Sequence, residues 1–340
     1  MQHPAISVAM SVYNGEQFLV EAIESVLGQS YADFEFLIVD DGSKDASTSI
    51  ISNFAAQDSR IRPILRENRG LIASLNEMLE LARAPIVARM DADDASQPER
   101  FALQKAFLDE HPDYGVVGTW SQEFDEDGQD MVGTGPDQPI THEGLLAGIE
   151  TGEQLVCHPT AMYRRDIVRS VGGYHAAFRH CEDYDLWLRL ANVTKLGNVP
   201  QRLLRYRRHM GQITERHTAE VHIGAAIAYL AYCGRLEGRE DPTADLENLP
   251  EIDELDALFG REGLSAPVRE KVALGLCWSA EAMRGDGYDL LMRHVRGGGR
   301  RKGMWRTVAR LVRFGNPLRA LNLAAALIFS RPLREPAVAS

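Results

Sequence analysis

Short apolar runs alternate with helical periodicities over the first part of the chain. Residues 6–11 and 34–39 are nearly continuous apolar runs, which is the pattern of strands buried on both faces of a parallel sheet. Between them, apolar residues recur at helical spacing: Phe18, Leu19, Ala22, Ile23, Val26 and Leu27. The pattern therefore predicts a strand, a helix and a second strand.

The same alternation continues for another sixty residues. Further helices are predicted near 46–57 and 71–83, and further strands at 61–66 and 85–90. Pro98 suits the first turn of the helix that follows, because proline is tolerated where no amide donor is needed. Four strand–helix units predict an open doubly wound α/β sheet.

From residue 114 the pattern changes to short strands of mixed order. The expected strands are 116–124 and 131–133, joined by a turn at 125–128, and then 161–164 and 203–208. From about residue 216 the chain is predicted to be helical, with an acidic stretch at 240–256 that forms solvated surface or a loop between helices. Because 340 residues exceed the usual size of one domain, we expect two, at 1–215 and 216–340.

Composition excludes several classes of protein. With 44% hydrophobic and 25% charged residues, the chain is neither disordered nor collagenous. Its four cysteines form no CxxC pair, so we expect small core residues rather than a zinc site or disulfide framework. No apolar run approaches the roughly 20 residues that span a bilayer, and the first residues lack a signal-peptide pattern, which favours a cytoplasmic location.

The charge is distributed unevenly. Residues 293–334 hold eleven of the 37 basic residues and no acidic one, so the rest of the chain has a net charge of −23. In this segment Trp305, Val308, Leu311 and Val312 recur at helical spacing beside arginines, and 318–329 predicts a second apolar helix. These helices either pack on the other domain with solvated arginines, or anchor the chain at an anionic membrane surface. A basic segment alone is also compatible with nucleic acid.

Two carboxylate clusters follow predicted strands at the edge where open α/β sheets bind ligands. Asp40 and Asp41 could accept hydrogen bonds from a ribose or a base, or could form a helix cap or Asx turn. The segment 91–94, Asp-Ala-Asp-Asp, favours a hard cation such as Mg²⁺ or Mn²⁺ over a capping loop, because three carboxylates at one strand end repel one another. No GxGxxG follows the first strand, which counts against a dinucleotide dehydrogenase.

Two later segments complete the set of polar motifs. Glu182 and Asp183 lead into an amphipathic run after the glycine turn at 172–173, where acids commonly serve only as helix-dipole partners. His209 ends the segment Tyr-Arg-Arg-His, where a lone histidine is ordinarily a surface or core residue.

In this order, the motifs resemble the family 2 glycosyltransferases, which have the GT-A fold. The match comprises SVAMSVYNGEQFLVEAIESVLGQSYADFEFLIVDDGSKD (7–45), ENRGLIASLNEML (67–79), MDADDASQPERFALQ (90–104), HPTAMYRR (158–165), VGGYHAAFRHCEDYDLWLRL (171–190) and YRRH (206–209). It covers about the first 210 residues. The resemblance implies a Rossmann-like mixed sheet flanked by helices, followed here by a helical C-terminal extension.

The resemblance also implies roles for individual residues. Ser11, Tyr13 and Asp41 would contact the nucleotide, and Asp91 would lie near its ribose and the metal. Asp93 would hold the metal at the diphosphate, with His209 as a further ligand. Asp183 would be the general base, with Glu182 as the second choice. Lys44 stands where threonine is common in the family, while no expected acid is missing.

We therefore expect an inverting, metal-dependent glycosyltransferase of the hexosyltransferase type. It would use Mn²⁺ or Mg²⁺ and a nucleotide sugar, with a UDP-sugar favoured, and transfer the sugar to a saccharide or lipid-linked acceptor in surface polysaccharide or glycolipid synthesis. A peripheral position at the inner face of the plasma membrane and no nucleic-acid partner are expected. The alternatives are a sugar nucleotidyltransferase, whose usual phosphate loop is absent here, and a non-catalytic carbohydrate-binding protein.

Overall fold

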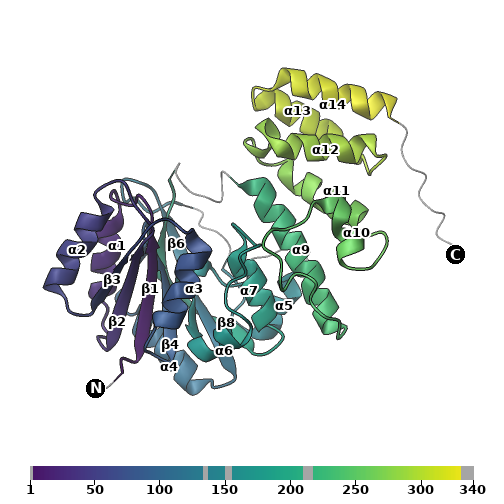
Figure 1. Ribbon diagram of the computed structural model, residues 1–340. Coiled ribbons are helices and arrows are strands. Elements are labelled where there is room, and N and C mark those ends of the chain that lie inside the picture. Colours follow the sequence, from purple (N-terminus) through teal and green to yellow (C-terminus); the bar gives the residue numbers. More distant parts are fainter. Residues whose placement is uncertain (1–2, 133–136, 150–154, 210–216, 331–340) are drawn as a thin grey trace. The chain divides into compact units, whose positions relative to one another are not determined.

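The computed structural model describes residues 3–132, 137–149, 155–209 and 217–330 (Figure 1). Contacts within it separate two units. The sheet unit comprises 1–176 with 182–210, and the helical unit comprises 177–181 with 211–340. The domain boundary expected after residue 215 lies outside the described residues and stays a prediction.

The sheet unit contains eight strands in the order β3-β2-β1-β4-β7-β6-β8-β5. The strands are β1 (Ile6–Val12), β2 (Phe34–Asp40), β3 (Ile61–Leu65), β4 (Ile86–Asp91), β5 (Ala95–Ser96), β6 (Tyr114–Phe124), β7 (Met162–Arg164) and β8 (Lys195–Arg207). The first four are parallel to one another, as their alternation with helices predicts. β7 runs antiparallel to β4 and β6, so the sheet is mixed, which confirms the expected fold class.

Helices cover both faces of this sheet. They are α1 (Leu19–Leu27), α2 (Ser47–Gln57), α3 (Leu71–Leu81), α4 (Arg100–Glu110), α5 (His142–Ile149), α6 (Arg165–Ser170) and α7 (Glu182–Leu190), with a 3₁₀ turn η1 (His158–Thr160). α3 lies in front of the sheet in Figure 1. Side chains of α1, α2 and α4 share one core cluster with alternate residues of β1, which places these helices together on one face.

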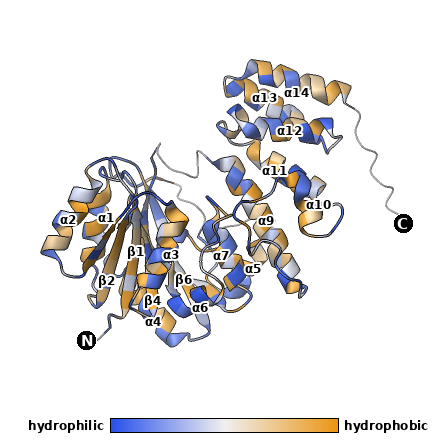
Figure 2. Cartoon of the chain, in the orientation of Figure 1, coloured by the Kyte–Doolittle hydropathy of each residue, from blue (hydrophilic) through white to orange (hydrophobic). Residues whose placement is uncertain are grey.

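The core forms because the central strands are apolar on both faces. In β1, Ile6, Val8 and Met10 are fully buried toward α1, and Ala9 is buried on the opposite face. The strands β1 and β2 accordingly stand out as hydrophobic in Figure 2. Sheets of this kind leave the carboxyl ends of their strands as the polar edge, which is where the site is built.

Two local predictions were wrong. α4 begins at Arg100, so Pro98 lies in a turn two residues before the helix. The Pro98 carbonyl accepts a hydrogen bond from the Ser30 amide at 2.9 Å. The strand expected at 131–133 is reduced to one bridge between Phe124 and Asp130. Residue 133 lies outside the described residues.

The helical unit follows the expectation of a helical C-terminal segment. It contains α9 (Thr218–Leu236), α10 (Leu255–Leu258), α11 (Ser265–Leu276), α12 (Asp286–Arg296), α13 (Met304–Arg313) and α14 (Pro317–Phe329), with 3₁₀ turns η2 (Ile252–Glu254) and η3 (Ala282–Arg284). Most of the acidic stretch 240–256 connects helices, as expected. Among the described residues, no helix has the length and apolar character required to cross a membrane.

The four cysteines are free, as expected from their spacing. Cys157, Cys181 and Cys277 are buried, which confirms them as core residues, and Cys233 is half-buried.

Candidate active site

Four of the expected nucleotide-binding residues meet at the carboxyl edge of β1, β2 and β4. Because β1 pairs in parallel with both neighbours, Ser11 lies beside Asp91 in register. The Asp41 amide donates to the carbonyl of Val12 at 2.8 Å, which fixes the start of the loop after β2 beside the end of β1. Tyr13 follows β1 directly and is more than half exposed, so its ring is available to a ligand.

The two aspartates at the end of β2 have different partners. Asp40 accepts the Ser43 amide at 2.9 Å and the Thr48 hydroxyl, so it forms the expected capping turn. Asp41 is buried and accepts the amides of Arg69 at 2.9 Å and Gly70 at 2.8 Å, together with the Arg66 guanidinium. The nucleotide role of Asp41 stays a prediction, and any ligand there would meet a carboxylate already held in place.

The Asp-Ala-Asp-Asp segment brings three carboxylates together. Ligand oxygens of Asp91, Asp93 and Asp94 all lie within 4.8 Å of one another. The short antiparallel pairing of β5 with β8, with Ala95 opposite Arg205, brings the end of β8 alongside this segment. His209 then lies with Nε2 2.9 Å from Oδ2 of Asp93.

Arg207 holds this arrangement and was not singled out from the sequence. Its amide donates to Oδ1 of Asp94 at 2.9 Å, and its guanidinium donates to the Asp93 carbonyl at 2.7 Å. The same guanidinium lies 4.2 Å from the ring centroids of both Phe18 and Phe124 and pairs with Glu21. Arg207 therefore fixes the backbone on which the acidic segment and His209 are placed.

The acidic cluster carries more negative charge than its protein partners balance. Oδ2 of Asp94 is buried without a hydrogen-bond partner among the described residues. Burial, together with the charges of Asp93 and Asp91, raises the pKa of Asp94 well above its usual value. Burial also raises the pKa of Asp91, although the neighbouring Arg89 cation opposes this. Carboxylates whose charged form is disfavoured by burial and by one another fit a divalent cation, because its charge would favour their ionised form.

Arg89 is the buried cation beneath the site. It lies in the middle of the otherwise apolar β4, is 4% exposed, and forms an ion pair with Asp91. A second buried arginine, Arg100, donates to the Arg89 carbonyl at 2.7 Å and to the Ser96 hydroxyl at 3.0 Å. The sequence signal for Arg89 is a charge inside a strand that is buried on both faces, which ordinarily requires a partner.

Glu182 and Asp183 begin α7, which is anchored in the sheet unit by the Trp187 indole donating to the Val156 carbonyl at 3.1 Å. Glu182 is buried, and desolvation with the adjacent Asp183 charge raises its pKa to about 7. Asp183 is half-buried; desolvation raises its pKa, against a 2.8 Å hydrogen bond from the Tyr184 amide and the attraction of Arg89. Because the charge of Asp91 also raises both pKa values, the two acids and the Asp-Ala-Asp-Asp segment belong to one electrostatic site.

The glycine turn before these acids is held by α3. The Asn76 side chain donates to the Tyr174 carbonyl at 2.8 Å and accepts the Tyr174 amide at 2.9 Å. The Tyr174 hydroxyl lies 3.1 Å from Nε2 of His158, whose pKa burial lowers well below its usual value. The turn is therefore held by an uncharged, half-buried side chain of α3.

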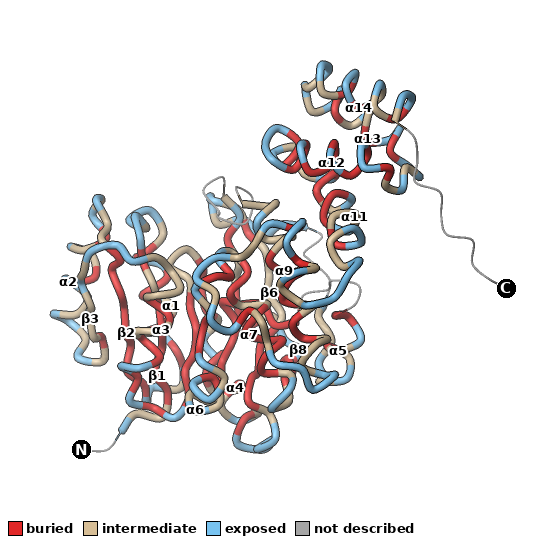
Figure 3. Tube along the Cα trace, turned by 45° about the vertical axis from the view of Figure 1, so that its right-hand side comes forward, coloured by how far each residue is buried: buried red, intermediate tan, exposed pale blue. Residues whose placement is uncertain are grey.

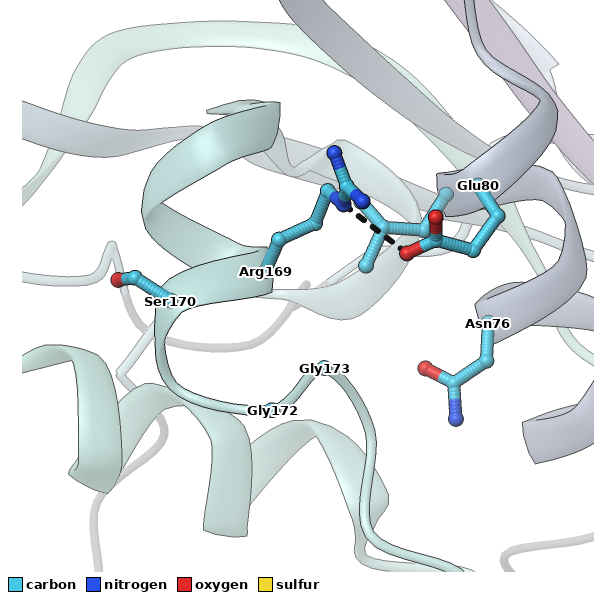
Figure 4. Close-up of a pocket in the computed structure, with 7 residues that line it drawn as sticks. Asn76, Glu80, Arg169, Ser170, Gly172 and Gly173 are labelled. Carbon is cyan, nitrogen blue, oxygen red and sulfur yellow. Dashed lines mark hydrogen bonds and ion pairs between the residues drawn. The ribbon is translucent and has the colours of Figure 1, made fainter.

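An open pocket of about 580 Å³ lies against this turn, lined by Asn76, Leu79, Glu80, Arg169, Ser170, Gly172 and Gly173. Figure 4 shows its polar side chains, with Arg169 and Glu80 joined by a 2.9 Å ion pair. None of the candidate site residues lines it. We therefore assign the chemistry to the carboxylate edge.

A second group of metal-ligand side chains, His180, His217 and Glu220, occurs in the helical unit. The two imidazole rings stack, with centroids 3.9 Å apart and planes 16° apart. Stacked rings direct their nitrogen lone pairs side by side rather than toward one point. This arrangement suits hydrogen bonds to a shared carboxylate better than a single ion.

Comparison with known proteins identifies the family. Residues 7–172 match the model of glycosyl transferase family 2. Over 238 residues the chain is 38% identical to the putative glycosyltransferase EpsE of Bacillus subtilis, covering 69% of this chain and 84% of the relative. The chain belongs to glycosyl transferase family 2. It is also 30% identical to the O-antigen biosynthesis glycosyltransferase WbnJ of Escherichia coli, over 60% of this chain and 80% of the relative.

Solved structures show the same fold at low sequence identity. Staphylococcus aureus TarS 1–349 in complex with UDP-GlcNAc aligns with a TM-score of 0.53 at 17% identity, over 98% of this chain and 94% of that chain. The mannosyltransferase PcManGT of Pyrobaculum calidifontis, in complex with GDP-Man and Mn²⁺, aligns with a TM-score of 0.50 at 17% identity, over 97% and 88%. The enzyme class and the GT-A fold expected from the motifs are thus confirmed.

Proposed function

We propose that this glycosyltransferase uses a nucleotide sugar and a divalent cation, and inverts the anomeric centre in one displacement. The observation that carries the proposal is the contact between Asp93 and His209 within a trio of carboxylates at the carboxyl edge of the sheet. The similar solved structures, one in complex with UDP-GlcNAc and one in complex with GDP-Man and Mn²⁺, support the donor class. A UDP-sugar is the favoured donor.

The donor would lie across the edge formed by β1, β2 and β4. Ser11, Tyr13 and Asp41 would hold the base and ribose, with Asp91 beside the ribose. Asp93, Asp91 and His209 would hold Mn²⁺ or Mg²⁺, which would neutralise the charge that develops on the departing diphosphate. The partial burial of Asp91 and Asp93 strengthens this electrostatic effect, because fewer water dipoles compete with it.

Asp183 would accept the proton of the acceptor hydroxyl as that oxygen attacks the sugar. Its half-buried position leaves it accessible, whereas Glu182 is buried. Glu182 would be the alternative base, because a pKa of about 7 suits proton transfer at neutral pH. Direct attack with a single base inverts the configuration, since no covalent sugar intermediate is formed.

The acceptor would be a saccharide or a lipid-linked saccharide in polysaccharide or glycolipid synthesis. Relatives whose names place them in O-antigen and amylovoran biosynthesis support this assignment. A lipid-linked acceptor would bring the enzyme from the cytoplasm to the inner face of the plasma membrane.

The test is release of nucleoside diphosphate from a panel of UDP-, GDP- and TDP-sugars, with Mn²⁺, with Mg²⁺ and with excess chelator. We expect turnover of one base class only, loss of turnover in chelator, and a product of inverted configuration by NMR. Turnover that persists in chelator would refute metal dependence, and retained configuration would refute the single displacement. Nucleoside monophosphate transfer would instead indicate a nucleotidyltransferase.

A further inference from the structure

The helices α13 and α14 each carry two separate sets of apolar residues. One set is buried inside the helical unit: Met304 and Leu311 on α13, beside the buried Thr307, and Ala320, Leu323 and Leu327 on α14. The other set is exposed: Trp305 and Val312 on α13, and Leu318, Leu321, Ile328 and Phe329 on α14. Packing within the unit therefore accounts for only one set.

The exposed residues form stripes. Trp305 and Val312 lie seven positions apart, with the half-buried Val308 between them, so all three share one side of α13. On α14, the exposed residues 318, 321, 328 and 329 recur at intervals of three, seven and eight, again along one side. Leu318 is 76% and Phe329 is 82% exposed, and apolar side chains gathered along one exposed side of a helix often mark a binding surface. Figure 3 shows buried and exposed positions alternating along both helices.

Exposed basic side chains precede and flank these stripes along the sequence. Six basic side chains between 293 and 313 are exposed: Arg293, Arg296, Arg300, Lys302, Arg306 and Arg313. Among the described residues, no ion pair involves any of them. The other arginines of these helices instead donate to backbone carbonyls, as Arg310 does to Cys277 and Arg319 to Met283.

We propose that the exposed side of α13 and α14, with these six basic residues, binds the headgroup region of an anionic membrane. The 13 residues of α14 reach only about 20 Å, so the helix would lie along the interface rather than cross it. Anionic headgroups complement the basic residues, and the boundary with the acyl chains accommodates the apolar stripes. Nucleic acid would satisfy the charges and leave the apolar side chains in water. This inference does not depend on the catalytic proposal.

The experiment is co-sedimentation of the full chain with vesicles of phosphatidylglycerol and phosphatidylcholine, and with phosphatidylcholine alone, at low and high salt. We expect binding to the anionic vesicles only, released by salt. Arg306→Gln with Arg313→Gln should weaken binding roughly tenfold to thirtyfold, because each basic residue near an anionic surface changes binding about fivefold. Leu318→Ser with Phe329→Ser should weaken it at least about tenfold through lost apolar burial.

Matched controls keep the comparison clear. Arg239→Gln with Arg261→Gln makes the same charge change elsewhere in the helical unit, and Val193→Ser removes an exposed apolar residue of the sheet unit; both should bind normally. Circular dichroism and thermal unfolding would verify that each variant is folded. The Trp305 emission should shift to the blue on binding, and Trp305→Phe should abolish most of that shift.

Three results would overturn the proposal. The first is no binding of the folded full chain to anionic vesicles, or an equal loss of binding in the controls. The second is weaker vesicle binding by the Arg306 and Arg313 double variant while the Leu318 and Phe329 double variant binds normally. That result would indicate a purely electrostatic partner such as nucleic acid. The third is a dimer in sedimentation velocity that the Leu318 and Phe329 pair disrupts while vesicle binding is absent.

Discussion

Asp93 and His209, 116 positions apart in the chain, meet with Oδ2 and Nε2 2.9 Å apart. Two features produce this contact: the loop after β4 turns back as β5, and β5 pairs with the end of β8. Arg207 then binds the loop between them through Asp94 and the Asp93 carbonyl. The imidazole and carboxylate thus lie on backbone fixed from both sides, as a metal site requires.

Asp93→Ala should abolish donor turnover with the fold retained, because it removes a carboxylate from the trio without disturbing a core residue. We expect a loss of at least about 10²-fold, the usual size for a removed transition-state charge contact. His209→Ala should mainly weaken Mn²⁺ binding, lowering the apparent affinity for the ion about 10- to 100-fold. Turnover measured against Mn²⁺ concentration separates the two effects. Asp109→Ala, at an exposed aspartate on α4, is the matched control and should behave as wild type.

Asp183→Asn should lower transfer at least about 10²-fold, since the amide keeps the shape but cannot accept the proton. Nucleotide affinity, measured by calorimetry, should be nearly unchanged. The pKa of Asp183 is raised above its usual 3.8. On acidification the wild-type rate should therefore begin to fall while the pH is still above 3.8, because the protonated acid cannot act as a base. If Glu182→Gln loses transfer while Asp183→Asn retains it, the two roles are exchanged. Asp166→Asn, at an exposed site on α6, controls for charge.

Arg89→Met should destabilise the sheet unit, because the buried Asp94 and the partly buried Asp91 would lose their cation. Removing one partner of a fully buried pair typically costs about 3–5 kcal/mol, and we expect a smaller loss here because the Asp91 side chain is 32% exposed. Bound Mn²⁺ would supply part of the missing positive charge, so thermal unfolding should show a larger stabilisation by Mn²⁺ in Arg89→Met than in wild type. An equal Mn²⁺ effect in both proteins would contradict the placement of Arg89 as counter-ion to the cluster.

Glu35 should make stability depend on acid pH. Burial alone would raise its pKa, but hydrogen bonds from Ser7, the Arg83 amide and Arg62 outweigh it and lower the pKa from 4.5. The folded state therefore binds this proton more weakly than the unfolded chain. The stabilisation is complete above pH 4.5 and is lost as the pH falls through the lower, folded value.

The Glu35→Gln variant tests this sign. It should be less stable than wild type at pH 7, by about 1–3 kcal/mol for a buried charged hydrogen-bond network. The difference should shrink as the pH falls through the folded pKa of Glu35, where wild type also loses its carboxylate charge. Glu110→Gln, at an exposed position of α4, should show no such convergence. Urea unfolding across this pH range gives the comparison.

The first half of the fold was predictable because its central strands are buried on both faces. Residues 6–12 and 34–40 are mostly apolar for that reason, and the polar residues at and beyond their carboxyl ends mark the ligand edge. The carboxylates of the site could be predicted for the same reason, because they lie at the ends of apolar strands. β8 was less visible, since it spans Lys195–Arg207 and only its last residues show a strand pattern.

The supporting residues could not be predicted because their contacts join distant segments. Arg207 meets Glu21 across 186 positions, and Asn76 meets Tyr174 across 98, and no periodicity records such pairs. Asp40 and Asp41 are adjacent and chemically identical, yet only the fold shows that one caps a turn while the other binds Arg66. Roles that depend on which side a loop faces require the three-dimensional structure.

The last prediction separates two adjacent glycines that hold the turn before Glu182. Gly172 and Gly173 both have positive φ, of 88° and 69°, so alanine is strained at either position by about 1–2 kcal/mol. Only at Gly173 would the added Cβ lie 2.6 Å from Oδ1 of Asn76; at Gly172 it meets no atom within 4 Å. Gly173→Ala should therefore break the Asn76 contacts with Tyr174 and shift the turn, lowering kcat more than Gly172→Ala does. Equal kcat values in two equally folded variants would show that the Asn76 contact does not position the acids of α7.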